Sequence, residues 1–187
     1  MTTLKDIKTT VLSMIEELNP NSEFLTDDAD IQSKINSVIN LVTQEVARMK
    51  KIPAYLELDV AEGDLVKFED ITTASDYKVY QLGNIKGVNF ELKANGTIIK
   101  VLETGTIEID FFRYPETITA ETPDDHELEL SEDALGIIPY GVAGDLLKSD
   151  VSANHGEIYY NRYETMLQRL DPRYSMGSFV VEGGVSV

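Results

Sequence analysis

Carboxylates are the most abundant side chains in this sequence that are able to do chemistry, with 33 Asp and Glu among 187 residues. A pair of carboxylates is the catalytic equipment of many glycoside hydrolases. Such an enzyme needs a cleft lined with aromatic side chains, whereas this chain has no Trp and an aromatic content of 8%. Asp27, Asp28 and Asp30 are spaced like the start of a calcium-binding loop, but the glycine and distal glutamate of that loop are missing. We interpret them as the acidic first turn of a helix.

Other residues that usually carry out catalysis or bind metals are scarce. The absence of cysteine excludes disulfides, zinc–thiolate sites and cysteine nucleophiles. The two histidines, His126 and His155, lie in different kinds of local sequence and are interpreted as solvated polar residues. No glycine cluster has the setting of a phosphate-binding loop, and no serine lies in a nucleophile elbow. We therefore expect no enzymatic activity and no catalytic, cofactor-binding or metal site. The alternative of an enzyme that uses carboxylates stays open.

Charge is distributed unevenly along the chain. Residues 103–150 contain thirteen acidic and two basic residues, which gives −11 of the total net charge of −17. Specific nucleic-acid binding is not expected, because counterion release requires clustered Lys and Arg. Membrane insertion is not expected either, because no apolar run approaches the roughly 18 residues of a membrane span. The amino terminus lacks the continuous apolar segment of a signal peptide.

Helical periodicity occurs at both ends of the chain. It predicts one helix over Leu4–Leu18 and a second from Thr26 to the basic residues before Pro53. A further helical pair is predicted between Leu130 and Leu170, joined by a polar link at 149–152 and packed antiparallel. Three small residues in this pair allow close approach of a partner backbone: Gly141, Ala143 and Gly144. Pro139 predicts either a kink or a helix that begins there after a tight turn.

The period changes at Tyr55, where short segments rich in β-branched and aromatic residues begin. We interpret Leu56–Tyr114 as a small antiparallel sheet or sandwich of roughly five strands. Asn95-Gly96 is the strongest hairpin signal. The chain ends in an apolar, glycine-flanked segment with strand propensity, which suits addition to the sheet edge of a neighbour.

Together these patterns predict an α+β fold. Residues 1–54 and 119–172 are expected to form an antiparallel helical bundle, with a β-rich insertion at 55–118. Residues 173–187 are expected to form an extended C-terminal arm.

Three stretches resemble parts of head–tail connector and adaptor (neck) proteins of tailed bacteriophages. The amino-terminal stretch, TLKDIKTTVL followed by TDDADIQSKINSVINLVTQEV, resembles the beginning of these proteins. The strand that leaves the β region is similar in TIEIDFFRYPETIT. The C-terminal helical pair is similar in LELSEDALGIIPYGVAGDLLKSDVSANHGEIYYNRYETMLQRLDPR. These are packing patterns rather than catalytic signatures, and they cover nearly the whole chain.

The resemblance implies a structural virion protein that is made in the host cytoplasm and assembled at the head–tail interface. Its partners would be the portal protein, tail or neck proteins and copies of itself, in a ring of twelve subunits through which DNA passes. Part of the acidic region 103–150 would then line the channel, with Asp124, Asp125 and Glu127 as the candidate channel-facing residues. The candidate assembly residues are Tyr159, Tyr163, Tyr174, Phe179, Val180 and Val181. The alternative is a tail or baseplate accessory binding protein that does not form a ring.

Overall fold

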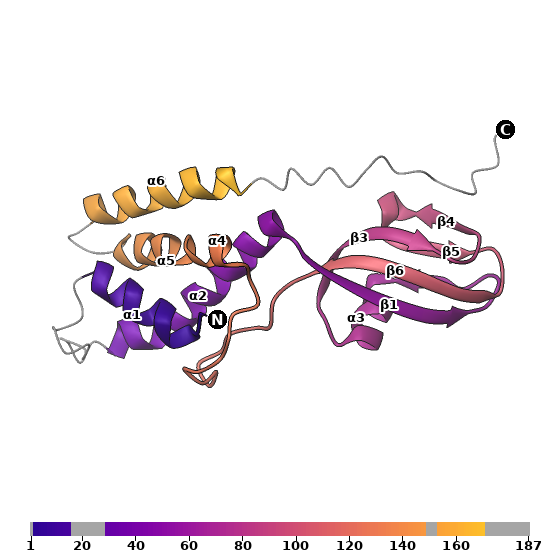
Figure 1. Cartoon of the computed structure of the whole chain (residues 1–187), viewed down its shortest axis with the longest axis horizontal. Coiled ribbons are helices and arrows are strands. Elements are labelled where there is room, and N and C mark those ends of the chain that lie inside the picture. The colour runs from indigo at the N-terminus through magenta and orange to yellow at the C-terminus, as the bar shows by residue number, and fades with distance from the viewer. Residues whose placement is uncertain (1, 16–28, 149–152, 171–187) are drawn as a thin grey trace. The chain divides into compact units, whose positions relative to one another are not determined.

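The computed structural model describes residues 2–15, 29–148 and 153–170 (Figure 1). The chain divides into two compact units. Of the described residues, the helical unit contains those up to Lys50 and those from Pro115 to Leu170, and the β unit contains Lys51–Tyr114. Each unit has its own hydrophobic core and is described by itself.

Five helices form the helical unit: α1 (Leu4–Met14), α2 (Ala29–Lys50), α4 (Glu132–Leu135), α5 (Ile138–Leu147) and α6 (Ala153–Arg169). α1 starts with a capping box, in which the amide of Asp6 donates to Oγ1 of Thr3 and the amide of Thr3 donates to the Asp6 carboxylate. α1 buries Leu4, Ile7, Val11 and Leu12. The predicted extension of this helix to Leu18 lies outside the described residues.

α5 is the centre of the helical unit, since it contacts α1, α2, α4 and α6. A Cβ atom added at Gly141 would lie 2.9 Å from the Tyr163 ring, and one at Gly144 would lie 3.0 Å from the Tyr160 amide nitrogen. At Gly156 it would lie 3.0 Å from Cβ of Leu147. The contacts ascend along α5 while they descend along α6, so the two helices are antiparallel. The predicted close approach of the pair is confirmed at Gly141 and Gly144.

The expected antiparallel bundle of the N- and C-terminal helices is wrong, although the α+β class holds. Helices of unequal length gather around the ten-residue α5. Within the described residues, α1 and α2 each pack on α5 rather than extensively on one another. The physical reason is that α5 is apolar on nearly all sides, and a helix of this kind is surrounded by neighbours. Pro139 contributes by beginning a new helix at Ile138, which confirms the second of the two predicted outcomes at this position.

The β unit contains six strands and a helix that the sequence analysis missed. Their bounds are β1 (Ile52–Val60), β2 (Leu65–Lys67), α3 (Phe68–Ser75), β3 (Val79–Lys86), β4 (Phe90–Lys93), β5 (Ile98–Val101) and β6 (Gly105–Arg113). A short 3₁₀ helix, Ala94–Gly96, joins β4 to β5. The sequence analysis left open a single antiparallel sheet or a sandwich of roughly five strands. The structure has two antiparallel sheets, ordered β1-β6-β3 and β2-β5-β4. The predicted hairpin turn is confirmed, because Asn95 and Gly96 both have positive φ angles.

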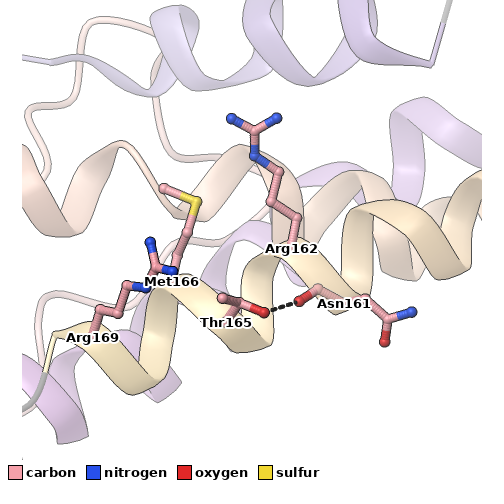
Figure 2. A pocket seen from close by; sticks show the side chains of 5 residues that line it. All are labelled: Asn161, Arg162, Thr165, Met166 and Arg169. Carbon is pink, nitrogen blue, oxygen red and sulfur yellow. Dashed lines mark hydrogen bonds between the residues drawn. The ribbon is translucent and has the colours of Figure 1, made fainter.

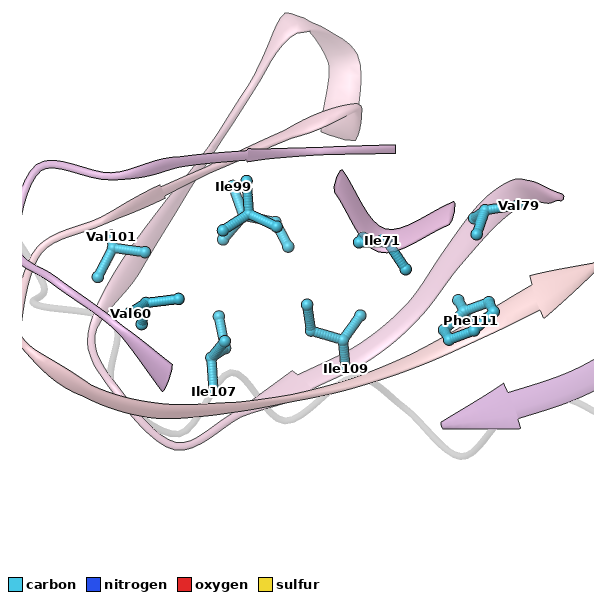
Figure 3. Packing of buried hydrophobic residues seen from close by; sticks show 9 residues of the cluster. Val60, Ile71, Val79, Ile99, Val101, Ile107, Ile109 and Phe111 are labelled. Carbon is cyan, nitrogen blue, oxygen red and sulfur yellow. The ribbon is translucent and has the colours of Figure 1, made fainter. Parts of the chain in front are cut away.

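Buried apolar side chains from both sheets and from α3 form the core of the β unit (Figure 3). In β1, Leu56 and Leu58 pack against this core, whereas Tyr55, Glu57 and Asp59 are exposed on the other face. β6 alternates in the same way. The core residues are Val60, Val66, Ile71, Val79, Ile99, Val101, Ile107, Ile109 and Phe111.

Candidate functional site

The most charged surface of the helical unit belongs to residues 116–133, here called the acidic segment. It leads into α4 and contains no Lys or Arg. Its carboxylates are all exposed to solvent. They belong to Glu116, Glu121, Asp124, Asp125, Glu127, Glu129, Glu132 and Asp133.

The amino terminus of α1 holds the middle of the acidic segment. The backbone amide of Leu4 donates to the carbonyl of His126 at 2.8 Å, and that of Lys5 donates to the carbonyl of Asp124 at 2.9 Å. These amides are among the first four of the helix and have no acceptor inside it. Thr3 also forms an isolated antiparallel bridge with Glu127. The segment therefore supplies acceptors that α1 requires, and α1 fixes the segment in return.

Two asparagines of α2 hold the beginning of the acidic segment. Nδ2 of Asn36 donates to the carbonyl of Thr119 at 2.7 Å, and Oδ1 of Asn40 accepts from the amide of Ile118 at 3.0 Å. Ile118, Leu128 and Leu130 turn inward and are buried. The apolar anchors consequently face the helices, and the carboxylates between them face solvent.

Only part of this negative charge is neutralised. Lys8 pairs with Asp124 at 2.7 Å, and Lys50 pairs with Asp133 at 2.6 Å. The hydrogen bond from Lys50 lowers the pKa of Asp133 below its ordinary value of 3.8. No cation of the described part of the chain pairs with the carboxylate of Asp125 or Glu127. The surface therefore repels phosphate groups and attracts cations.

The structure brings the three candidate channel-facing residues together and places two assembly candidates inside the fold. Asp124, Asp125 and Glu127 all lie at the part of the acidic segment held by α1. The Tyr159 hydroxyl donates to the carbonyl of Met14 at 2.8 Å, and that ring is half-buried. Tyr163 is only 1% exposed. Tyr174, Phe179, Val180 and Val181 lie outside the described residues.

Burial is the main reason that the pKa of the Tyr163 hydroxyl is raised, and the hydrogen bond that it donates to Glu45 at 2.7 Å adds to the effect. The hydroxyl therefore stays protonated and ties α6 to α2. This placement makes the ring part of the interior of the unit.

A depression of about 440 Å³ on the outer side of α6 was not identified from the sequence (Figure 2). It is lined by Asn161, Arg162, Thr165, Met166 and Arg169. The guanidinium of Arg162 lies 4.5 Å from the centre of the Tyr140 ring of α5, a cation–π contact that orients it. A sequence signal was available, since these five residues recur at helical spacing and Arg162 and Arg169 are seven apart.

Among the described residues, no group of three or more His, Asp and Glu side chains is arranged to hold a metal ion. None of the helices described is both long enough and apolar enough to cross a membrane. Comparison with protein-family models and with curated proteins found no match to this chain.

Proposed function

We propose that this chain is a structural virion protein that forms a ring between the portal and the tail of a tailed bacteriophage and extends the DNA channel. The acidic segment carries the proposal. It offers exposed carboxylates without a single Lys or Arg, and hydrogen bonds to α1 and α2 hold its backbone in place. The sequence resemblance to connector proteins supports the same role.

The wall of a DNA channel must allow a polyanion to slide without binding it. Double-stranded DNA carries one phosphate charge per roughly 1.7 Å of axis, and Lys or Arg on the wall would bind it by releasing counterions. Carboxylates repel the phosphates instead, and the repulsion acts over a Debye length of about 8 Å at physiological salt. A backbone fixed by α1 and α2 keeps these charges on the wall.

The role requires positioning and assembly rather than catalysis. The partners in this proposal are the portal ring, tail or neck proteins and further copies of the chain, in the virion and beforehand in the host cytoplasm. The alternative is an accessory tail or baseplate protein that binds a partner without forming a ring.

Size measurement with and without the portal protein encoded by the same genome tests the proposal. Light scattering after size-exclusion chromatography is expected to show a complex that contains a full ring of this chain on each portal ring. Electron micrographs of that complex should show the portal channel lengthened by one layer. A chain that binds a tail protein as a single copy and ignores the portal would support the accessory role instead.

A further inference from the structure

α6 carries an exposed stripe of mixed apolar and cationic character. The stripe consists of residues spaced alternately by three and four, which places them on one face of the helix. Ile158 near its amino-terminal end is 63% exposed, a high value for a large apolar side chain. The acidic residues of the exposed turns, Glu157 and Glu164, fall on the opposite side of the helix. The stripe residues are His155, Ile158, Arg162, Thr165 and Arg169, with Met166 beside them.

The two arginines of the stripe have no carboxylate partner in the part of the chain that the structure describes. This is unusual in a chain with a net charge of −17. Arg162 is held over Tyr140. Arg169 lies about one turn beyond Met166 (Figure 2). A partner that fits this stripe must offer carboxylates and an apolar contact together.

The outer face of the β1–β6 pair offers both. Tyr55 is 51% exposed, and with Pro53 and Ala54 it lines a depression of about 400 Å³ that also includes Asp110. Further along the same two strands, Glu57 lies directly opposite Glu108.

Like charges at directly opposite positions destabilise an antiparallel pair of strands, so a cation that docks between Glu57 and Glu108 relieves their repulsion.

The hydrogen bond from Tyr55 to Glu57 is the main reason that the pKa of Tyr55 is raised to about 12, and the charges of Glu108 and Asp110 add to the effect. Lys86 of β3 lies at the register position opposite Glu108, and Asp59 completes the acidic end of the face. The face therefore has an apolar end and an acidic end.

We propose that the α6 stripe of one copy of this chain docks on the outer face of the β1–β6 pair of a second copy. Ile158 meets the apolar end at Tyr55, and Arg162 and Arg169, further along α6, meet the carboxylates further along the two strands. The lengths agree, because α6 from Ile158 to Arg169 spans about 17 Å and β1 from Pro53 to Asp59 spans about 20 Å.

The acidic segment is the weaker fit for α6. Its large apolar residues Ile118, Leu128 and Leu130 are all buried, so it presents carboxylates without an apolar contact. Because the α6 stripe and the β1–β6 face are different surfaces, the contact is heterologous and propagates from copy to copy until it closes. Closure into a ring rests on the proposed function, whereas the contact itself does not. The arrangement leaves the acidic segment free to face the DNA.

Charge reversal with rescue tests the contact on the full chain. The α6 variant is Arg162→Glu with Arg169→Glu, and the sheet variant is Glu108→Arg with Asp110→Arg. Each alone is expected to weaken self-association at least tenfold, in sedimentation velocity at about 50 mM salt with and without portal. A one-to-one mixture is expected to restore it, because each reversed surface then meets its complement on the other variant. Glu157→Lys with Glu164→Lys, on the far side of α6, is the matched control and should associate as wild type.

Cysteine crosslinking provides a second readout that does not depend on charge, since the chain has no native cysteine. Ile158→Cys mixed with Tyr55→Cys should form a disulfide-linked heterodimer under mild oxidation. The control is Ile158→Cys mixed with Leu92→Cys, which should not form one. Leu92 is a residue of β4 that is exposed to a similar degree as Tyr55.

Single reversals that associate normally, a mixture that fails to recover, or a rescue obtained instead with Asp124→Arg and Asp125→Arg would each overturn the contact. If wild type forms rings on the portal that ignore these changes, the contact is wrong and the proposed function stands. If wild type stays monomeric with and without the portal, both are wrong.

Discussion

Among the described glycines of the helical unit, Gly141 of α5 has the closest neighbours to an added Cβ atom. An added Cβ would lie 2.9 Å from both the Tyr163 ring and Cγ1 of Val42, and Tyr163 is too deeply buried to move aside. We expect Gly141→Ala to destabilise the unit by about 1–3 kcal/mol through overpacking. Urea unfolding followed by far-ultraviolet circular dichroism would measure the change.

Gly136→Ala is the matched control for that substitution. Gly136 has a right-handed helical conformation, and the nearest atom to an added Cβ is 3.6 Å away. The alanine should leave the unfolding midpoint unchanged or raise it slightly. Equal effects of the two substitutions would show that the α5–α6 contact is looser than the structure indicates.

Asp133 links the stability of the helical unit to pH. Its pKa is lowered, chiefly by the hydrogen bond from Lys50. A lowered pKa in the folded state means that the stabilisation is present above the ordinary value of 3.8 and is lost as the pH falls through the folded pKa. Asp133→Asn should therefore be less stable than wild type at pH 6, and the difference should shrink as the pH falls through the lowered pKa of Asp133. Thermal unfolding at a series of pH values would show whether the two curves converge. NMR titration of the Asp133 carboxyl carbon would measure its pKa directly. The titration midpoint should occur at higher pH in Lys50→Met, because the hydrogen bond that lowers the pKa is then missing.

At the scale of elements, α2 determines where the acidic segment begins. Ile118 is 3% exposed, and its amide donates to Oδ1 of Asn40. Asn40→Ala leaves that buried amide without its acceptor, which costs roughly 1–3 kcal/mol. Local opening should rise accordingly, so the exchange protection of the Ile118 amide is expected to fall roughly tenfold to a hundredfold. Gln44→Ala removes a neighbour that donates to the same oxygen but leaves Asn40 in place, and it should preserve the protection.

Elements that depend on local chemistry were predictable from the sequence, and those that depend on tertiary contacts were not. Pro139 narrowed its region to a kink or a helix start, and Asn95-Gly96 indicated the turn between β4 and β5, because each restricts its own backbone. α3 was missed because its β-branched residues favour strands by propensity. It forms where Asp70 accepts from the amide of Lys67 and Ile71 enters the core of the β unit.

The candidate site divides in the same way. Asp124, Asp125 and Glu127 are close in sequence, so their grouping required no knowledge of the fold. Their attachment to α1 joins residues more than a hundred positions apart, and no local pattern indicates such a pairing. The α6 depression was missed because the helical period alone does not say which polar face lacks a partner.

At the scale of the whole molecule, negative charge is collected on two surfaces with different surroundings. The acidic segment has carboxylates around buried apolar anchors, which suits repulsion without contact. The β1–β6 face has carboxylates beside the exposed ring of Tyr55, which suits association. A uniformly acidic chain would be soluble but would have no means of recognising its own copies. The carboxylates of the acidic segment surround buried apolar residues, whereas those of the β1–β6 face lie beside an exposed aromatic ring. This difference is the reason that we assign the two surfaces different roles in the proposed ring.

Reversal of the charge on the acidic segment is the sharpest test of its role in the channel. Asp124→Lys, Asp125→Lys and Glu127→Lys together turn a repelling surface into one that binds phosphate. Each new lysine–phosphate contact adds about 0.9 to the slope of log affinity against log salt. Rings that carry the three lysines should therefore retain DNA at low salt and release it as salt rises, whereas wild-type rings should not retain it. Fluorescence anisotropy of labelled duplex with assembled rings would measure this.

The matched control for the channel carries lysines at Glu62, Glu69 and Glu157, three exposed positions that change the net charge by the same amount. A general electrostatic effect would make both triple variants bind DNA alike, because phosphate attraction would then follow total charge. A channel role predicts that only the acidic-segment variant retains DNA threaded through the ring, and that it ejects DNA more slowly from assembled particles. If the acidic-segment variant ejects DNA at the wild-type rate, the acidic segment does not face the DNA path. Solubility would then remain as the explanation of its charge.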